Sequence, residues 1–400
     1  MTATTPKVAP TGRAGVYVHV PFCLRHCPYC DFAVVVTRSI PHEAYRDAVL
    51  RELQDRAAAL EGRSVRTLYF GGGTPGLWDP AAIGAVVDAV RALPGAALEE
   101  VTIELNPERT EPARLTALRR AGVTRVSLGV QSFDDASLAV LGRLHDGAGA
   151  IGAIERVVDA GFAHLSVDLI VGAPGVDPGA PVQDARRVAS MRGVDHVSTY
   201  DLTWEPGTAY EARRARGRLE AWSDDALADA SDAVDDALAS GGFARYEVSN
   251  HARPGGHAVH NAAYWVGDEY LGLGVGAHSL CVADRIERRA NGRHPGRYLD
   301  DPHADAAVDV VAAQTHLAEL AMTGLRTAQG IDLGDLHRRF GARAAAVDAW
   351  ARDAMRRGQV RREGGRVVPT THGLRFADAL ALDVLHRVDD TPTCTPGDGA

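Results

Sequence analysis

The stretch Tyr17-Val18-His19-Val20-Pro21-Phe22-Cys23-Leu24-Arg25-His26-Cys27-Pro28-Tyr29-Cys30-Asp31-Phe32 places three cysteines directly after a short apolar strand. Their spacing, C-x3-C-x2-C, lets one loop wrap three corners of a cubane iron–sulfur cluster, because each of its irons needs a terminal ligand and thiolates are the usual choice. The fourth iron is then left without a protein ligand. An open coordination position is what a catalytic metal keeps for its substrate. The loop therefore predicts a [4Fe–4S] site at Cys23, Cys27 and Cys30.

A zinc site of three cysteines with His19 or His26 is the alternative interpretation. Zinc sites prefer two separated ligand pairs, and no second Cys or His pair follows nearby at finger spacing. The other two cysteines, Cys281 and Cys394, are isolated, and we expect neither to take part. An odd number of cysteines argues against a pure disulfide framework.

The N-terminal sequence and the net charge limit the class of protein to which the chain can belong. Met1 to Gly12 lack the apolar segment of a secretory signal, and clustered thiols without such a signal favour a reducing, cytoplasmic location. No apolar run approaches the ~20 residues needed to cross a bilayer. The net charge of −9 disfavours a protein that works by gripping nucleic acid.

Six short apolar runs alternate with stretches of helical period, which predicts an α/β fold with a parallel sheet and right-handed crossovers. Six units are too few for an eight-stranded barrel, so we expect a partial (β/α)6 barrel with its ligand site at the carboxyl ends of the strands. The expected strands are Val16–Val20, Arg66–Phe70, Val101–Leu105, Arg125–Val130, Leu165–Val171 and His196–Leu202. The expected helices are Tyr45–Leu60, Pro80–Leu93, Ala113–Ala121, Gly149–Ala160, Val182–Met191 and Asp224–Ser240.

The pattern changes after about Asp301 and predicts a small winged-helix-like domain. Its expected parts are helices Ala307–Leu325, Asp332–Phe340 and Ala344–Gly358, strands Gln359–Arg362 and Arg366–Pro369, and a last helix Gly373–Leu385. The predicted domains are thus a flexible N-terminus over 1–14, the barrel over 15–300, the winged-helix-like domain over 301–388 and a disordered tail over 389–400. The arginine-rich C-terminal module could bind DNA, or it could present an ordinary solvated face.

Glycines and polar residues end several expected strands, at the mouth of the predicted barrel. Gly71-Gly72-Gly73-Thr74-Pro75 follows the second strand, where glycines allow a close backbone approach to a ligand or simply form a tight turn. Asp168 lies inside an apolar strand, where a charge is costly unless it is paired. One structural role for it is an ion pair with Arg143. Glu104 and Gln131 end the third and fourth strands.

The cysteine loop after the first strand resembles the signature of radical S-adenosylmethionine (SAM) enzymes. That resemblance implies that the amino and carboxylate groups of SAM chelate the open iron, and that the reduced cluster cleaves SAM to methionine and a 5′-deoxyadenosyl radical. It implies that the glycine turn contacts the methionine part of SAM. By resemblance to the coproporphyrinogen-oxidase-like branch, the SAM site comprises Tyr17, Tyr29, Gly72, Gly73, Thr74, Glu104, Gln131, Arg143 and Asp168.

Two features resemble the radical SAM heme chaperone family within that branch. Phe32 stands where the oxygen-independent coproporphyrinogen dehydrogenase has a further cysteine. His260-Asn261-Ala262-Ala263-Tyr264-Trp265 matches the H-N-x-x-Y-W motif of the chaperones, and it continues into Tyr270-Leu271-Gly272-Leu273-Gly274-Val275-Gly276-Ala277-His278-Ser279. The match makes His260 a candidate heme ligand, whereas residue chemistry alone favours ordinary core packing.

The resemblance implies a chaperone that binds a [4Fe–4S] cluster, SAM and heme, and that passes heme to acceptor hemoproteins, among them membrane respiratory enzymes. It implies that the C-terminal module covers the barrel opening. Whether the protein forms a homodimer is left open by the sequence, and no nucleic-acid partner is expected. The alternatives are an oxygen-independent coproporphyrinogen III dehydrogenase, which would be an enzyme, and a zinc-stabilised winged-helix DNA-binding protein.

Overall fold

A computed structural model of the chain describes residues 8–370, 373–374 and 376–389. The strands are β1 Arg13–Val20, β2 Phe22–Cys23, β3 Val35–Val36, β4 Ser64–Gly72, β5 Ala96–Leu105, β6 Arg125–Gln131, β7 His164–Val171, β8 His196–Asp201, β9 Ala244–Arg245, β10 Asn250–Ala252, β11 Glu269–Leu273, β12 His278–Val282, β13 Ile286–Ala290, β14 Ala307–Val311, β15 Ile331–Asp332, β16 Val360–Glu363 and β17 Arg366–Pro369.

The helices cover the sheet and build the C-terminal module. They are α1 His42–Arg56, α2 Pro80–Arg91, α3 Pro112–Arg120, α4 Asp135–Val140, α5 Gly147–Ala160, α6 Ala180–Ser190, α7 Ala209–Ala215, α8 Asp224–Ser240, α9 Val259–Trp265, α10 Pro295–Asp300, α11 Ala313–Gly324, α12 Leu333–Phe340, α13 Ala345–Arg356 and α15 Ala377–Asp389, with short 3-10 turns at Ala57–Leu60, Pro75–Leu77, Pro107–Arg109 and Gly341–Ala344.

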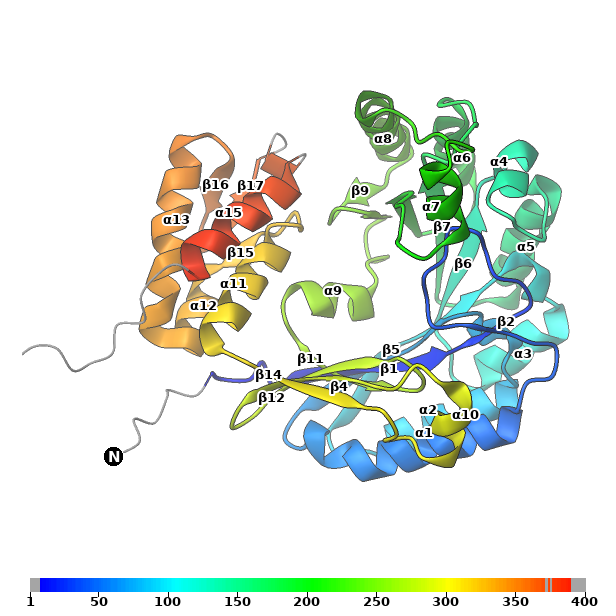
Figure 1. The fold of residues 1–400 in the computed structure, drawn as a ribbon, viewed down its shortest axis with the longest axis horizontal. Coiled ribbons are helices and arrows are strands. Elements are labelled where there is room, and N and C mark those ends of the chain that lie inside the picture. Colours follow the sequence, from blue (N-terminus) through cyan, green and yellow to red (C-terminus); the bar gives the residue numbers. More distant parts are fainter. Residues whose placement is uncertain (1–7, 371–372, 375, 390–400) are drawn as a thin grey trace, which may run out of the picture.

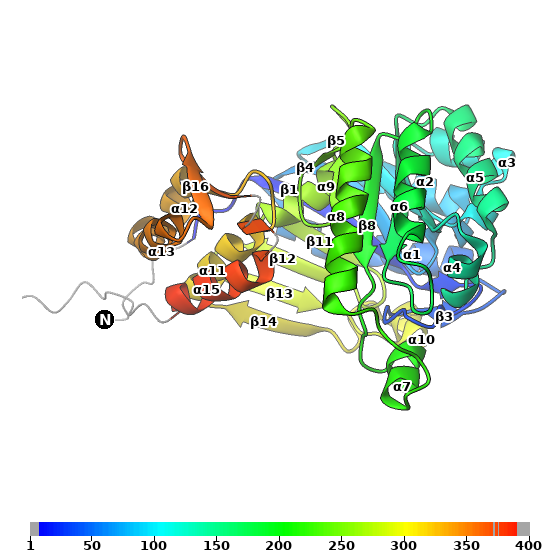
Figure 2. The same ribbon diagram turned by 90° about the horizontal axis from the view of Figure 1, so that it is seen from above.

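The predicted partial barrel is confirmed. Strands β1, β4, β5, β6, β7 and β8 are neighbours in that order, and every adjacent pair is parallel. Helices lie along the outside of the curved sheet (Figures 1 and 2). Alternate side chains such as Val16 and Phe70 point outward into the core beneath these helices and are fully buried. The other set of side chains points into the barrel and is largely polar, which leaves the interior available for a ligand.

The sheet is larger than the sequence pattern indicated. Strand β11 pairs in parallel with β1, strands β12 to β14 continue antiparallel from it, and β10 and β9 extend the other edge beyond β8. The expected helix Ala307–Leu325 is wrong over its first five residues. They form β14, which pairs with β13, and α11 begins only at Ala313. The β-branched Val308 and Val310 suit a strand, and sheet pairing overrides the helical period of their neighbours.

Helix α9 closes the barrel near the amino ends of its strands. Glu100 on β5 accepts hydrogen bonds from the backbone N–H groups of Val259 (3.0 Å) and His260 (2.9 Å), which begin α9. Arg125 on β6 donates to Glu100 at 2.8 Å and to the carbonyl oxygen of His257 at 2.9 Å. Both members of this ion pair are almost completely buried. The buried carboxylate of Glu100 therefore fixes the start of the H-N-x-x-Y-W segment at this end of the barrel.

The C-terminal module is winged-helix-like, as predicted, and has its own core. Helices α11, α12, α13 and α15 pack around a three-stranded sheet ordered β15-β17-β16, with Trp350 at the centre of the core. Part of the segment 1–14, which the sequence predicts to be flexible, contacts this module. Val8 is buried in this core, and the backbone N–H of Ala9 donates to the carbonyl oxygen of Arg339.

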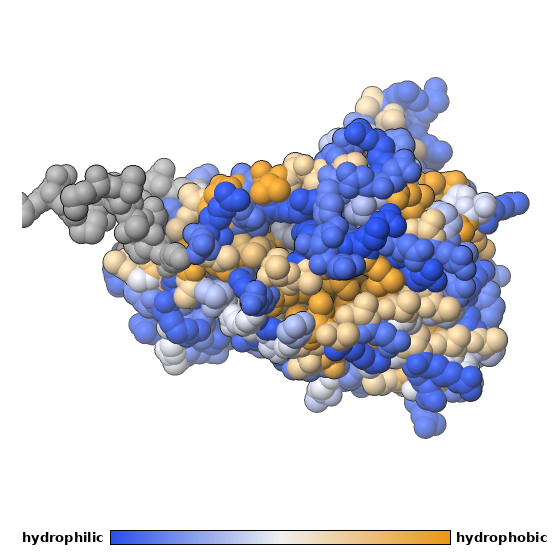
Figure 3. Space-filling model, turned by 90° about the horizontal axis from the view of Figure 1, so that it is seen from below, coloured by the Kyte–Doolittle hydropathy of each residue, from blue (hydrophilic) through white to orange (hydrophobic). Residues whose placement is uncertain are grey.

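The ends of the chain lie partly outside the described residues. The predicted disordered tail over 389–400 lies outside them except for Asp389, which ends α15. The expected last helix Gly373–Leu385 is largely present, since Gly373 and Leu374 are helical and α15 runs from Ala377 to Asp389. Among the described residues, no helix combines the length and the apolar character needed to span a membrane. The face seen from below mixes hydrophobic with hydrophilic residues (Figure 3).

The contribution of the buried Arg125–Glu100 pair to stability can be tested by mutation. Removing one member of a buried ion pair leaves an unpaired buried charge, so Arg125→Ala should lower the free energy of unfolding by about 3–5 kcal/mol. Arg66→Ala is the matched control, because its pair with Glu99 is exposed and should contribute less than about 1 kcal/mol. Urea unfolding followed by circular dichroism measures both. Equal losses would contradict the role given to the buried pair.

Candidate functional site

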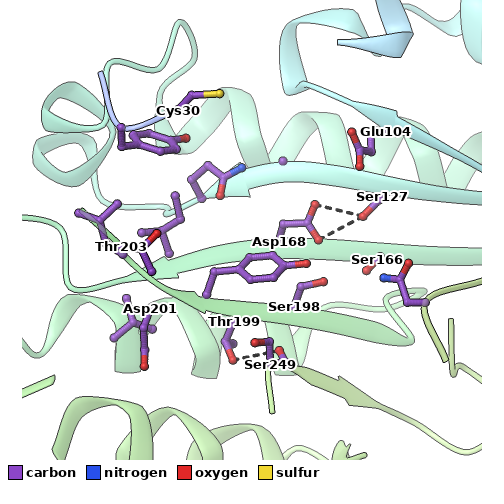
Figure 4. A pocket seen from close by; sticks show the side chains of 18 of the residues that line it. Cys30, Glu104, Ser127, Ser166, Asp168, Ser198, Thr199, Asp201, Thr203 and Ser249 are labelled. Atoms are coloured by element: carbon purple, nitrogen blue, oxygen red, sulfur yellow. Dashed lines mark hydrogen bonds between the residues drawn. The ribbon is translucent and has the colours of Figure 1, made fainter. Parts of the chain in front are cut away.

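A cavity of about 1200 Å³ opens at the carboxyl ends of the parallel strands. Figure 4 shows part of it, with Cys30 above the strands and Glu104, Ser127 and Asp168 on their inner face. Its lining includes all three predicted cluster cysteines and most of the predicted SAM residues, namely Tyr29, Gly72, Gly73, Thr74, Glu104, Gln131, Arg143 and Asp168. The rule that ligands bind at this end of the strands therefore located the cavity correctly.

Backbone hydrogen bonds hold the cysteine loop against the glycine turn. The N–H groups of Gly73 and Thr74 donate to the carbonyl oxygens of Val20 (2.9 Å) and Phe22 (2.8 Å). A side chain at Gly73 would meet the Phe22 carbonyl oxygen at 2.9 Å, which is too close. The N–H of Gly72 donates to Glu104 at 3.0 Å. These glycines thus seat the cysteine loop, and the amide hydrogens of Gly72 and Gly73 already have protein partners.

A chain of polar side chains joins two of the cysteines. The Thr74 hydroxyl donates to the sulfur of Cys23 at 3.6 Å and accepts from the Asn106 amide at 3.1 Å. Arg143 donates to the Asn106 oxygen at 2.6 Å and to the sulfur of Cys27 at 3.7 Å. Hydrogen bonds to cysteine sulfurs tune iron–sulfur clusters. Sequence reasoning missed Asn106, although its place directly after strand β5 was a usable signal.

The three cysteines supply thiol groups to one wall of the cavity. Cys23, Cys27 and Cys30 come from one loop, all line the cavity, and the Arg143 guanidinium lies beside them as a compensating positive charge. Within the part of the chain that the structure describes, no three His, Cys, Asp or Glu side chains are placed to share one metal ion. The choice between an iron–sulfur cluster and zinc with His19 or His26 therefore rests on the spacing of the cysteines and not on this geometry.

Two carboxyl groups lie inside the barrel beside the loop. Glu104 accepts a hydrogen bond from the Tyr69 hydroxyl at 2.7 Å, and Asp168 accepts from the Ser127 hydroxyl at 3.1 Å. Burial raises the pKa of Glu104 to about 7 and that of Asp168 to about 6. The Arg143–Asp168 ion pair considered from the sequence is not formed, because the Arg143 guanidinium turns toward Asn106 and Cys27 instead.

Gln131 takes a backbone conformation that side chains rarely adopt. Its φ is +69°, in the left-handed region, where strand β6 shifts register against β7 between Leu128 and Gln131. A non-glycine residue in this region is strained, and such residues gather at binding sites. The irregularity places Gln131 in the lining of the cavity.

The structure places two predicted site residues outside the main cavity. The Tyr17 hydroxyl lies 3.1 Å from Nδ1 of His19, and Tyr17 lines a second, smaller cavity. His260 is buried, with Nδ1 2.8 Å from the Thr67 hydroxyl and Nε2 2.9 Å from the Tyr264 hydroxyl. Burial lowers the pKa of His260 to about 4. Both ring nitrogens have partners, so the geometry favours core packing for His260 over heme ligation.

The C-terminal module supplies part of the cavity wall. Arg326, Leu374, Phe376 and Asp378 all line it, opposite the barrel strands. Arg326 and Asp378 form an ion pair at 2.5 Å at this edge. The module therefore forms part of the wall of this cavity.

Comparisons with known proteins agree with this geometry. Residues 17–188 match the radical SAM superfamily model, and residues 311–376 match the HemN C-terminal domain. The heme chaperone HemW of Mycobacterium tuberculosis is 38% identical over 382 residues, which cover 93% of this chain and 94% of that protein. This chain belongs to the HemW heme chaperone family of radical SAM proteins.

Other members of the family and one solved structure are also similar. HemW of Escherichia coli is 37% identical over 74% of this chain and 79% of its own. The bovine mitochondrial radical S-adenosyl methionine domain-containing protein 1 is 30% identical over 96% of this chain and 91% of its own. The radical SAM coproporphyrinogen III oxidase HemN of Escherichia coli superposes with a TM-score of 0.76 at 23% identity, over 96% and 91% of the two chains, which supports the fold.

The raised pKa of Glu104 predicts a pH dependence of stability. A carboxyl group whose pKa is higher in the folded chain than in the unfolded chain favours folding at low pH, and this contribution is lost as the pH rises through the folded pKa. The free energy of unfolding of the wild type should therefore fall between about pH 5 and about pH 7, and it should fall less in Glu104→Gln. Thermal unfolding of the apoprotein at several pH values measures this. Parallel profiles would contradict the assignment.

Proposed function

We propose that this protein is a heme chaperone that holds a [4Fe–4S] cluster on Cys23, Cys27 and Cys30, binds SAM in the main cavity, and passes bound heme to acceptor hemoproteins. The observation that carries the proposal is the three-cysteine loop seated over that cavity in a chain of the HemW family. A cytoplasmic location and acceptors among membrane respiratory enzymes belong to the same proposal.

The chain's own residues have defined tasks in this proposal. The thiolates of Cys23, Cys27 and Cys30 would hold the cluster and would leave one iron for the amino and carboxylate groups of SAM. When bound, the cluster would supply one-electron reducing chemistry. Arg143 offsets the negative charge of the thiolates, and Glu104 and Asp168 offer acceptors for hydroxyl groups, such as those of a ribose. The C-terminal module limits access of water to this side of the barrel.

An enzymatic role, the oxidative decarboxylation of coproporphyrinogen III, is the rival function. It shares the SAM site and a cavity of tetrapyrrole size. The sequence favours the chaperone because Phe32 replaces the further cysteine expected for the dehydrogenase. A DNA-binding role is disfavoured, because the arginine-rich module carries many of its charges in ion pairs, such as Arg357–Asp383 and Arg366–Asp332.

Anaerobic purification tests the cluster. The wild type should contain about four irons and four sulfides per chain and absorb as an iron–sulfur protein. Cys23→Ala, Cys27→Ala and Cys30→Ala should each lose most of this iron, because each removes a terminal ligand. Cys281→Ala is the matched control and should keep it, since Cys281 lies on β12 away from the loop. Zinc bound at these cysteines, or full iron content in all three variants, would contradict the proposal.

Two assays on the same preparation separate chaperone from enzyme. Titration with heme should show saturable binding, followed by the Soret absorbance, because the chaperone must hold its cargo. Incubation with coproporphyrinogen III, SAM and a reductant should yield no protoporphyrinogen. Product formation at a rate comparable with a coproporphyrinogen dehydrogenase would favour the enzyme, and absence of heme binding would refute the chaperone.

A further inference from the structure

Arginines gather on one exposed helix of a chain whose net charge is −9. Helix α7, which Figure 2 shows projecting from the body of the barrel, and the turn after it carry four exposed arginines, namely Arg213, Arg214, Arg216 and Arg218. The acidic residue of this helix is Glu211, in its first turn. Within the described part of the chain, none of the four arginines forms an ion pair with a carboxylate. This local excess of positive charge attracts an anionic partner.

The same helix is fixed to the cysteine loop. The N–H of Tyr210 donates to the carbonyl oxygen of Pro28 at 2.9 Å, and Pro28 directly follows Cys27. The hydroxyl of Tyr210 donates to the carbonyl oxygen of Val140, the last residue of α4, at 2.6 Å. The pKa of Tyr210 is raised to about 12 by burial, lowered by Arg213 and raised by Cys27, so both groups lie close to its hydroxyl. The arginines of α7 therefore stand beside the proposed cluster.

The wall between the proposed cluster and the solvent is thin at Cys27, because this residue lines the main cavity and also a separate small hollow at the surface. Leu24, Arg25 and Leu144 line that hollow. Leu24 is 39% exposed and Leu144 is 52% exposed, so the rim of the hollow is apolar. Phe32, also exposed, does not line the hollow and lies in the wall shared by the main cavity and the second, smaller cavity. A protein that rests on the two leucines therefore comes close to Cys27.

The hollow and helix α7 adjoin each other at Pro28. A side chain at Gly142 would meet Cδ of Pro28 at 2.9 Å and the Arg25 guanidinium at 3.8 Å, so these groups pack around one point. Arg25 is exposed and forms no ion pair with any carboxylate that the structure describes. We call this region the α7 surface, with Leu24 and Leu144 at its apolar part and Arg25 and the four arginines of α7 around them. Apolar contacts with a charged rim are the usual anatomy of a protein docking site.

The chemistry of the neighbouring site indicates the class of partner. A cluster that gives up one electron has to be reduced again by a one-electron donor from outside the chain. An acidic protein surface complements the unpaired arginines, and opposite charges steer such encounters. Electron-transfer complexes are small and transient, so a surface of this size is sufficient. A nucleic acid or an anionic membrane would also meet the arginines, but neither carries electrons to the thin wall at Cys27.

We propose that the α7 surface docks an acidic electron-transfer protein, which passes one electron through the wall at Cys27 to the cluster. The carrier loses one electron and the cluster gains it, and no covalent bond forms or breaks. This inference rests on the proposed function, because it requires the cluster, and it adds the partner that reduces the cluster.

Rapid anaerobic mixing with a reduced bacterial flavodoxin, which is an acidic one-electron carrier, tests the surface. The rate of cluster reduction is followed by absorbance and checked by the electron paramagnetic resonance signal of the reduced cluster. The double variant Arg213→Glu/Arg216→Glu should lower the second-order rate constant at low salt by at least about tenfold, since steering by opposite charge contributes about 10- to 1000-fold. Arg214 is left in place because its guanidinium lies over the Trp204 ring at 5.2 Å. Added salt should slow the wild type and remove most of the difference.

A second reductant and a second double variant are the controls. Reduced methyl viologen is a small cation that the arginines do not attract, so its rate should not fall in Arg213→Glu/Arg216→Glu. The variant Arg120→Glu/Arg192→Glu makes the same change of charge at exposed positions just before β6 and β8, near the amino ends of the strands. It should keep the wild-type rate with both reductants. Cluster iron, measured in each variant, checks that the site is retained.

Three outcomes would overturn the docking surface while the chaperone function stands. They are equal losses in the two double variants, a loss with methyl viologen as well, and an unchanged rate with flavodoxin in Arg213→Glu/Arg216→Glu. If that variant keeps its rate but loses binding to a DNA oligonucleotide or to phosphatidylserine vesicles, the arginines serve that polyanion instead. A wild type without an iron–sulfur cluster would overturn the proposed function and this inference together.

Discussion

The seating of the cysteine loop on the glycine turn is the contact on which the site depends. Two parallel strands, β1 and β4, end side by side, and the N–H groups that follow β4 bond to the carbonyl oxygens of Val20, which ends β1, and Phe22. Only a residue without a side chain fits at Gly73. Because these bonds belong to the backbone, the loop is positioned before any cofactor binds, and its three cysteines line the cavity.

The polar interior of the barrel is the second constraint. Buried polar groups are costly unless they are bonded, and here three pairs are tied across neighbouring strands: Tyr69 to Glu104, Ser127 to Asp168, and Arg125 to Glu100. The hydrogen bonds of Glu100 and Arg125, near the amino ends of the strands, hold α9 in place. Those near the carboxyl ends face the cavity and are available to a ligand. The barrel is thus closed by α9 near the amino ends of its strands and open to a ligand at their carboxyl ends.

Sequence reasoning succeeded where the signal was local. The six strands, the glycine turns and the cysteine spacing are properties of short segments, and the rule for parallel sheets brought Glu104, Gln131 and Asp168 to one cavity. It failed where pairing between distant segments decides the outcome. Strand β14 carries a helical pattern yet pairs with β13. The partners of Arg143 and His260 depend on how β5, β6 and α9 meet, and no single-sequence pattern encodes that.

The wall shared by the two cavities has a thermodynamic consequence. Asp31, Phe32 and Gly72 touch both spaces, and the ring of Phe32 is largely exposed. A molecule that moves this ring when it enters one space alters the free energy of filling the other. Linkage requires the effect to be equal in both directions. The protein thus has, in a single side chain next to Cys30, a means for each occupant to sense the other.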